Sequence, residues 1–243
     1  MPVYTSDALI LRTYKLGEAD RIVVFLTRDR GKKRGVAKGA RRPRSRFLGT
    51  LEPLTRAGVA YYERELRDLV RINYVEPQNS PLAAVGRVDG DASALGHADE
   101  RLYRLGASAI DALASGAPVA RLARYFEFWL LRLQGVYPQV SSCPACGGAF
   151  DGGAVMPPRD AHFLCRRCAS DSAAGGTTVS IEALRFLRAA ASSGPDALDQ
   201  MPLDPGAGRD LEIAHRRLLT VHLDKELKSA RVLRSLMAGS ERA

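Results

Sequence analysis

Four cysteines stand in the chain as two pairs with the same internal spacing, Cys143-Pro-Ala-Cys146 and Cys165-Arg-Arg-Cys168. Eighteen residues separate the two pairs. Each Cys-x-x-Cys can form a tight turn that directs two thiolates at one ion, so two such turns complete a tetrahedral four-sulfur shell. We predict one structural zinc ion per chain, bound by all four cysteines, in a finger that spans about residues 140–172.

A four-sulfur shell argues against a catalytic metal, because it leaves no position open for a substrate. A zinc nucleobase deaminase requires a His-x-Glu before the first cysteine pair, and this chain has none. In thioredoxin-like redox sites the cysteine pair follows a strand of a βαβ unit, and neither pair does so here. His162 lies three residues before Cys165, but four sulfurs already suffice. Phosphate-loop, nucleophile-elbow and zinc-protease motifs are absent from the sequence. We predict a protein that is not an enzyme, with a zinc hydrolase as an alternative.

The first 75 or so residues predict five short strands. Expected strands lie at 8–14, 21–27, 32–38, 54–62 and 66–75, with turn residues between them, and all but the run at 32–38 are rich in apolar, β-branched or aromatic residues. No helix long enough to cover a flat sheet lies among these runs, and a small closed barrel leaves no exposed sheet edge. We therefore predict a five-stranded OB-fold barrel over residues 1–78.

Residues 79–243 predict an all-helical domain into which the zinc finger is inserted, so the fold class is α+β. Asp99 is expected to cap the first helix, Pro118 to begin a second that ends at Gly135, and Ser180 to cap a third. A loop is expected over 193–208 and a last long helix over 209–237. His215 and His222 are expected to be partly buried residues of that helix. The residues expected on the buried face of the second helix are Leu122, Tyr125, Phe126, Trp129, Leu130 and Leu133.

A basic run between residues 28 and 46 accounts for the net charge of the chain, which is +9. Only Asp29 opposes the cations of this run, so the rest of the chain sums to zero. Positive charge concentrated in this way favours a polyanionic partner. The predicted DNA contacts are Arg28, Arg30, Lys32, Lys33, Arg34, Lys38, Arg41, Arg42, Arg44 and Arg46.

The second half of the basic run is expected to be a flexible loop that follows a phosphate backbone, because Pro43 prevents a regular helix there. Phe47, at the end of the loop, is the candidate for base stacking, whereas Phe25 is expected in the core. Nothing resembles a helix that reads bases, so we expect little sequence specificity. An RNA-binding zinc-ribbon protein of ribosome assembly is the alternative that the residues leave open.

The apolar runs are shorter than the roughly 18 residues that a membrane span needs, and the N-terminus has no signal segment. These features predict a cytoplasmic protein with no membrane partner.

The order of these motifs resembles the bacterial RecO family of recombination mediators. The resemblance is carried by GEADRIVVFLT at 17–27, Gly31-Lys32, AKGARRPRS at 37–45, LEPL at 51–54 and GVYP at 135–138, and it covers nearly the whole chain. It implies an N-terminal OB-fold, a helical C-terminal domain, and a zinc finger in members that keep four cysteines.

The resemblance also implies a function. Proteins of this family bind single- and double-stranded DNA, anneal complementary strands, and act with RecR to load RecA onto DNA coated by single-strand-binding protein. The acidic, hydrophobic tail of single-strand-binding protein docks on the helical domain, and basic residues of the last helix, such as Arg217 and Lys225, are the expected rim of that site. The location implied is cytoplasmic and associated with the nucleoid.

Overall fold

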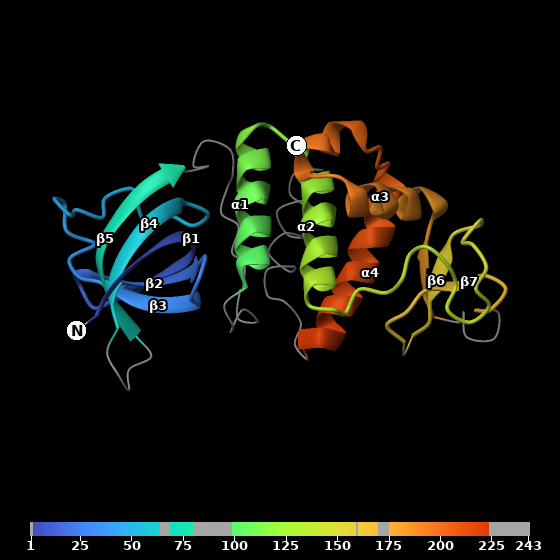
Figure 1. Ribbon diagram of the computed structural model, residues 1–243, viewed down its shortest axis with the longest axis horizontal. Coiled ribbons are helices and arrows are strands. Elements are labelled where there is room, and N and C mark those ends of the chain that lie inside the picture. The colour runs from blue at the N-terminus through green and yellow to red at the C-terminus, as the bar shows by residue number, and fades with distance from the viewer. Residues whose placement is uncertain (1, 64–68, 80–98, 159, 170–174, 224–243) are drawn as a thin grey trace. The chain divides into compact units, whose positions relative to one another are not determined.

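The computed structural model describes residues 2–63, 69–79, 99–158, 160–169 and 175–223 (Figure 1). They fall into two compact units, one that runs to Ala114 and one that begins at Ser115. The first unit therefore includes a helix that follows the barrel. The division into a barrel domain over 1–78 and a helical domain over 79–243 stays a prediction. Within the described residues no helix is long and apolar enough to cross a membrane.

Five strands form a closed barrel in the order β1-β2-β3-β5-β4, with β4 paired back to β1 (Figure 1). The β3–β5 pairing is parallel and the other pairings are antiparallel. The predicted OB-like barrel is confirmed. Its strands are β1 (Val3–Leu16), β2 (Asp20–Thr27), β3 (Gly31–Ala37), β4 (Arg56–Tyr62) and β5 (Leu69–Asn79).

Alternating side chains fill the barrel interior. Val23 and Phe25 of β2 point inward and are fully buried, with Tyr61 of β4 in edge contact with Phe25 at a ring separation of 5.6 Å. Strand β5 continues through Pro77, which the sequence suggested was already a boundary. β3 pairs only with residues 69–72 of β5, so one side of β5 needs no ladder hydrogen bonds at Pro77.

Helix α1 (Glu100–Ala114) belongs to the same unit as the barrel. It begins as predicted, because the Asp99 carboxylate accepts a hydrogen bond from the backbone N–H of Arg101 at 2.9 Å. An ion pair of 2.8 Å joins Glu100 to Arg28 on the barrel. Gly106 allows α1 to approach β1 closely, since a Cβ at this position would lie 2.6 Å from Cδ1 of Leu9.

The second unit is built on helices α2 (Val119–Leu133), α3 (Ile181–Ser192) and α4 (Pro205–Leu223), with a short 3-10 helix η1 (Pro195–Gln200). The predicted helix ends are confirmed for α2 and α3. Pro118 precedes α2, Gly135 follows it with φ of +72°, and the Ser180 hydroxyl accepts from the N–H of Ala183.

Two predictions for these helices are wrong in detail. The buried face of α2 carries Phe128 and Leu131 beside Leu122 and Tyr125, because this face packs against α3, η1 and α4. The other predicted residues, Phe126, Trp129, Leu130 and Leu133, are only partly buried. The predicted loop over 193–208 contains η1, and α4 begins at Pro205, where the Asp204 carboxylate caps its first amides. The part of the last helix predicted beyond residue 223 lies outside the described residues.

The cysteine pairs lie in an insert between α2 and α3. A small sheet of order β7-β6-β8 organises it, from β6 (Ala154–Met156), β7 (Leu164–Cys165) and β8 (Thr177–Val179). The guanidinium of Arg217 on α4 donates to the backbone carbonyls of Met156 and Pro157. This contact ties the insert to the helical body.

Replacing Gly153 by alanine is expected to destabilise the insert. Gly153 has φ of +88°, and a Cβ there would lie 2.7 Å from the carbonyl oxygen of Val179. Such strain costs about 1–3 kcal/mol, which for a chain of this length lowers the Tm by roughly 2–12 °C in thermal unfolding of the purified protein. Gly152→Ala is the matched control, because its nearest neighbour is Cδ of Arg166 at 3.8 Å. Equal Tm values for the two variants would contradict this reading of the turn.

Candidate metal centre and nucleic-acid interface

The insert brings the four cysteines into one cluster. Their sulfur atoms all lie within 4.8 Å of one another, and the Cys146 and Cys165 sulfurs are 3.8 Å apart. Four ligands at the usual zinc–sulfur distance of about 2.3 Å in a tetrahedron have sulfurs roughly 3.8 Å apart. The observed spacing therefore fits a single four-coordinate metal ion, and the two motifs lie in one cluster as predicted.

Backbone amides surround the sulfurs of the first pair. The N–H of Cys165 donates to Sγ of Cys143 at 3.4 Å, and the N–H of Gly148 donates to Sγ of Cys146. Gly147 has φ of +70°, and a Cβ on Gly148 would lie 3.4 Å from the Cys146 sulfur. The two glycines thus serve the turn by letting amides approach the thiolates.

The pKa values of Cys143, Cys146 and Cys168 are shifted in different directions. Burial raises the pKa of Cys143, but hydrogen bonds from the backbone N–H groups of Cys165, Ala145 and Cys146 outweigh it and lower the pKa to about 6. The Gly148 amide also lowers the pKa of Cys146. Hydrogen bonds with the Cys146 and Cys165 sulfurs raise the pKa of Cys168 to about 12. A metal ion bound among the four sulfurs would displace the remaining protons, because it is the thiolates that ligate a metal.

His162 takes no part in the cluster. Its ring is exposed and lies 3.9 Å from the Asp160 carboxylate. With four sulfurs supplied by cysteine, a bound metal ion would have no open coordination position for a substrate. What this arrangement can do chemically is to hold an ion and, through it, to fix the insert.

The predicted DNA contacts lie on the barrel unit and are not equivalent. Arg34 is on β3, whereas Lys38, Arg42 and Arg44 lie in the segment that follows it. All four side chains are exposed, and none forms an ion pair with a carboxylate of the described residues. These four cations are available to a polyanion; we call them the open cations.

Other cations of the basic run are already engaged. Arg28 pairs with Glu100, and Lys33 pairs with Glu63 at 2.6 Å. Arg30 lies over the ring of Tyr4 at 3.9 Å, and Arg41 donates to the carbonyl of Gly17 at 2.8 Å. Arg46 lies 4.9 Å from the ring of Phe47. Lys32 also takes part in an interaction within the structure.

The segment after β3 is anchored to the barrel. The N–H of Gly39 donates to the Asp20 carboxylate and the N–H of Arg41 to the carbonyl of Ala19, both on the β1–β2 turn side. Phe47 is 2 % exposed and packs in the barrel core with Leu51. The prediction of Phe47 as a base-stacking residue is therefore wrong, because the barrel needs its ring to fill the interior.

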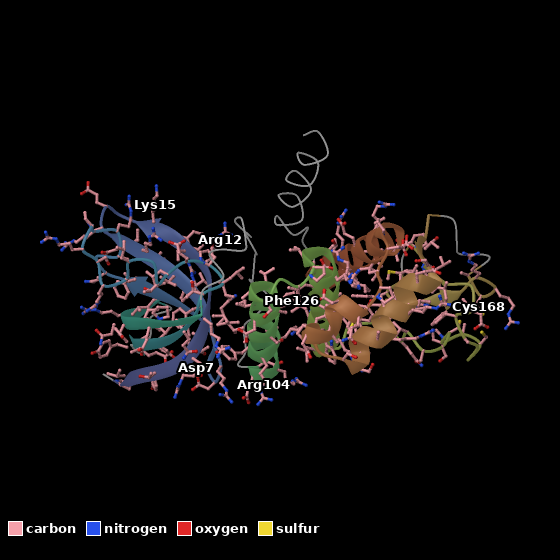
Figure 2. All side chains as sticks on the ribbon, turned by 90° about the horizontal axis from the view of Figure 1, so that it is seen from above. Asp7, Arg12, Lys15, Arg104, Phe126 and Cys168 are labelled. Carbon is pink, nitrogen blue, oxygen red and sulfur yellow. The ribbon has the colours of Figure 1, made fainter. Side chains whose placement is uncertain are left out.

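The register of the strands adds Arg12 and Tyr14, which were not predicted from the sequence, to the candidate DNA-binding surface. Arg12 on β1 lies opposite Val24, which lies opposite Arg34, so the two arginines share the outer face. Tyr14, on the same face of β1, is 42 % exposed and lies under the Arg12 guanidinium at 5.0 Å. Figure 2 shows Arg12 and Lys15 on one side of the barrel, away from Asp7. Period-two alternation along β1 was the signal for this face.

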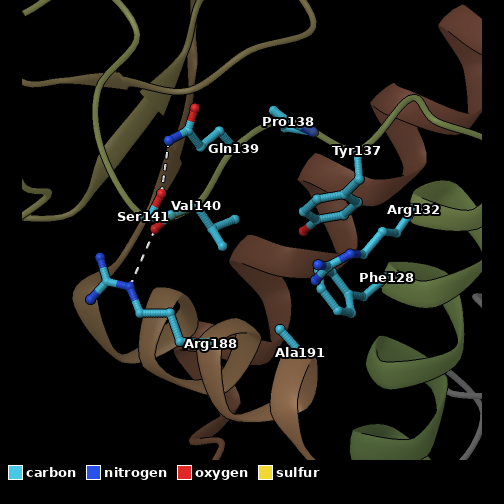
Figure 3. A pocket seen from close by; sticks show the side chains of 9 residues that line it. All are labelled: Phe128, Arg132, Tyr137, Pro138, Gln139, Val140, Ser141, Arg188 and Ala191. Carbon is cyan, nitrogen blue, oxygen red and sulfur yellow. Dashed lines mark hydrogen bonds between the residues drawn. The ribbon is translucent and has the colours of Figure 1, made fainter. Parts of the chain in front are cut away.

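A pocket of about 480 Å³ lies in the second unit (Figure 3). Its floor is apolar, with Phe128 of α2 and Ala191 of α3, and one wall is the segment from Tyr137 to Ser141. Two exposed arginines, Arg132 and Arg188, line it, and neither is paired with a carboxylate among the described residues. An apolar hollow flanked by cations suits an acidic ligand with an apolar side chain.

A buried polar network stands behind this pocket. The Tyr137 hydroxyl lies 2.7 Å from Nε2 of His215, and Nδ1 of His215 lies 2.9 Å from the Glu127 carboxylate. Arg124, 7 % exposed, pairs with Glu127 at 2.8 Å and with Glu212 at 3.7 Å. Burial, together with Glu127, raises the pKa of Tyr137 well above its ordinary value. His215 is thus fully buried, whereas His222 is exposed.

Comparison with known proteins agrees with this architecture. Residues 1–81 match the family model "Recombination protein O N terminal", and residues 92–231 match "Recombination protein O C terminal". The DNA repair protein RecO of Koribacter versatilis is 34% identical over 253 residues, which covers 95% of this chain and 98% of the relative. RecO of Anaeromyxobacter sp. strain Fw109-5 is 35% identical over 93% of both chains. RecO of Bifidobacterium longum strain NCC 2705 is 39% identical over 70% of this chain and 79% of its own. The chain belongs to the RecO family of DNA repair proteins.

Proposed function

We propose that this protein is a recombination mediator that binds single- and double-stranded DNA, anneals complementary strands and, with RecR, helps load RecA onto DNA coated by single-strand-binding protein. The observation that carries the proposal is the set of open cations on one closed barrel of a RecO-family chain. The protein acts without a chemical step of its own, in the cytoplasm and associated with the nucleoid.

The mechanism is electrostatic. The open cations neutralise phosphates and release counterions, which gives binding that depends little on sequence. Two strands held on one cationic surface repel each other less, so they can align and pair. The remaining cations of the basic run, from Arg28 to Arg46, extend the positive field even where a carboxylate partly balances them.

Tyr14 replaces Phe47 as the candidate for base stacking. It is an exposed aromatic ring beside Arg12, on the outer face that continues to Arg34. Stacking of a base on an aromatic side chain contributes about 1–3 kcal/mol and requires an unpaired base. Tyr14 therefore favours single strands, whereas the cations serve both forms of DNA.

The ion that we assign to the four-cysteine cluster is Zn²⁺, one per chain, with a structural role. Soft thiolate ligands in a tetrahedron are the set that zinc prefers in proteins. The ion holds the insert together, and it supplies no open coordination position for catalysis.

The pocket between α2, α3 and the Tyr137–Ser141 wall is our proposed docking site for the acidic, hydrophobic tail of single-strand-binding protein. Arg132 and Arg188 supply the positive charge, and Phe128 supplies the apolar contact. The rim on the last helix that the sequence suggested is less suitable. Arg217 is engaged with the carbonyls of Met156 and Pro157, and Lys225 lies outside the described residues.

Arg132→Glu is expected to weaken binding of a tail peptide at least tenfold, because it places a like charge beside an acidic ligand. Fluorescence anisotropy with a labelled peptide of the tail of single-strand-binding protein measures the effect. Arg185→Glu is the matched control, since Arg185 is an exposed arginine of α3 that does not line the pocket. Unchanged affinity for Arg132→Glu would place the tail elsewhere.

A gel-shift comparison tests the proposed function as a whole. Single-stranded DNA, duplex DNA and RNA of one sequence are each titrated at two salt concentrations. Comparable binding of both DNA forms, steeply weakened by salt, supports the mediator. Strong preference for RNA would support the alternative of an RNA-binding zinc-ribbon protein of ribosome assembly.

A further inference from the structure

One segment of the chain serves two sites. Residues Tyr137–Ser141 form a wall of the pocket, and Cys143 of the metal cluster follows two residues after Ser141. The segment lies outside the helices and strands of the structure, so no ladder of backbone hydrogen bonds fixes it. Its position depends on anchors at its two ends and on few contacts between them.

The anchor at the start of the wall is the Tyr137 side chain. Its hydroxyl bonds to His215, and its ring meets Phe128 edge-on at 4.7 Å. The same ring lies 6.4 Å from the ring of Phe163, a fully buried residue two positions before Cys165. Tyr137 thus lines the pocket on one side and, on the other, faces Phe163, the residue just before β7 and the second cysteine pair.

The anchor at the far end is Cys143 itself. It is fully buried, its N–H donates to the carbonyl of Gly148, and its sulfur accepts from the N–H of Cys165. Between the anchors, the carbonyl of Val140 accepts one hydrogen bond from Arg188 at 3.2 Å (Figure 3). Arg188 is also one of the two pocket arginines, so movement of the wall would break the hydrogen bond that positions its guanidinium at the pocket.

The secondary structure of the insert is small, although buried residues such as Phe150 and Phe163 and the Arg217 contact also hold it. Its sheet has strands of three, two and three residues, and small elements of this size need a metal or a disulfide for stability. Without an ion, the Cys143 anchor is expected to loosen, and with it the Phe163 side of the Tyr137 anchor, whereas the contacts of Tyr137 with His215 and Phe128 remain.

We propose that metal occupancy of the four-cysteine cluster controls the pocket, so that the tail of single-strand-binding protein docks tightly only on the metal-loaded protein. This inference rests on the proposed docking of the tail in the pocket. Coupling between two sites is reciprocal: if the metal strengthens peptide binding about tenfold, the peptide must strengthen metal binding by the same factor.

The experiment measures both directions on the full-length wild type. Affinity for the labelled tail peptide is determined with one equivalent of Zn²⁺ and after removal of metal with a chelator. Zn²⁺ affinity is then determined by chelator competition with and without saturating peptide. We expect a loss of peptide affinity of about tenfold without metal, matched by a tenfold gain in Zn²⁺ affinity with peptide.

Two variants separate the causes. Cys168→Ser removes a ligand from the second pair and leaves the Tyr137–Cys143 segment chemically unchanged, so it should weaken peptide binding as chelation does. In Arg132→Glu the peptide should no longer alter Zn²⁺ affinity. Circular dichroism and DNA binding verify that the helices and the barrel persist without metal.

The outcomes are distinct. Equal peptide affinity with and without Zn²⁺, in protein that keeps its helices, overturns the coupling and leaves the docking site intact. No peptide binding even by the Zn²⁺-loaded wild type overturns the docking site, and the coupling with it. A change in peptide affinity without the matching change in Zn²⁺ affinity also overturns the coupling, since it breaks reciprocity.

Discussion

Cys143→Ser protein is expected to lose its metal and to unfold in the insert, while the barrel stays folded. Cys143 is the fully buried cysteine of the cluster, and its sulfur accepts a hydrogen bond from the backbone N–H of Cys165. Structural zinc binds small domains with an apparent free energy of about 10–16 kcal/mol at neutral pH, far more than strands of two or three residues provide. Elemental analysis should fall from about one zinc per chain to nearly none, and thermal unfolding should gain an early transition.

The control for this prediction is His162→Ala. His162 is a potential ligand near Cys165 in sequence, but it is exposed and outside the cluster, so the variant should retain zinc and the wild-type Tm. Zinc affinity should also decrease as pH falls, because binding displaces the protons that the thiols regain in acid. Freshly purified wild type without metal, or loss of zinc in His162→Ala, would contradict the assignment.

Local signals in the sequence were sufficient for much of the fold. The cysteine spacing predicted that the two pairs meet in one cluster, because a Cys-x-x-Cys turn is a short-range structure. The caps at Asp99 and Ser180 were likewise identifiable, since each depends on residues within one helical turn. The apolar run at 21–27 likewise predicted a strand, with Phe25 in the core.

Long-range packing decided what the sequence did not reveal. Glu127 and His215 are far apart in the chain, and only the packing of α2 against α4 shows that they share a hydrogen bond. Phe47 follows a basic segment and resembles an exposed ring, yet the barrel draws it into the core. The pocket is formed by α2, α3 and a loop, so no single stretch of sequence encodes it.

The largest effect on DNA binding is expected when the four open cations are replaced together. Arg34, Lys38, Arg42 and Arg44 are exposed and unpaired with carboxylates of the described residues, so alanine at these positions should leave the barrel core intact. With about five phosphate contacts, the log–log salt slope of the wild type on duplex DNA should be on the order of −4 to −5. Each lost contact reduces the slope by about one unit, so the quadruple variant should approach roughly −1.

A charge-matched control removes four cations elsewhere, at Arg101, Arg104, Arg185 and Arg209. Its net charge equals that of the quadruple variant, so a specific surface and a general loss of positive charge give different results. Filter binding at a series of salt concentrations, with circular dichroism and zinc content, makes the comparison. An equal reduction in slope for both variants would mean that net charge, rather than this surface, governs binding.

The most direct test of the account is annealing of two complementary DNA strands, each coated with single-strand-binding protein, followed by fluorescence energy transfer between labels on the strands. We predict that the wild type and the charge-matched control accelerate annealing, whereas the quadruple variant, folded and loaded with zinc, does not. Annealing by the quadruple variant at the wild-type rate would contradict the account, because it would show that the barrel surface is not where the strands are brought together.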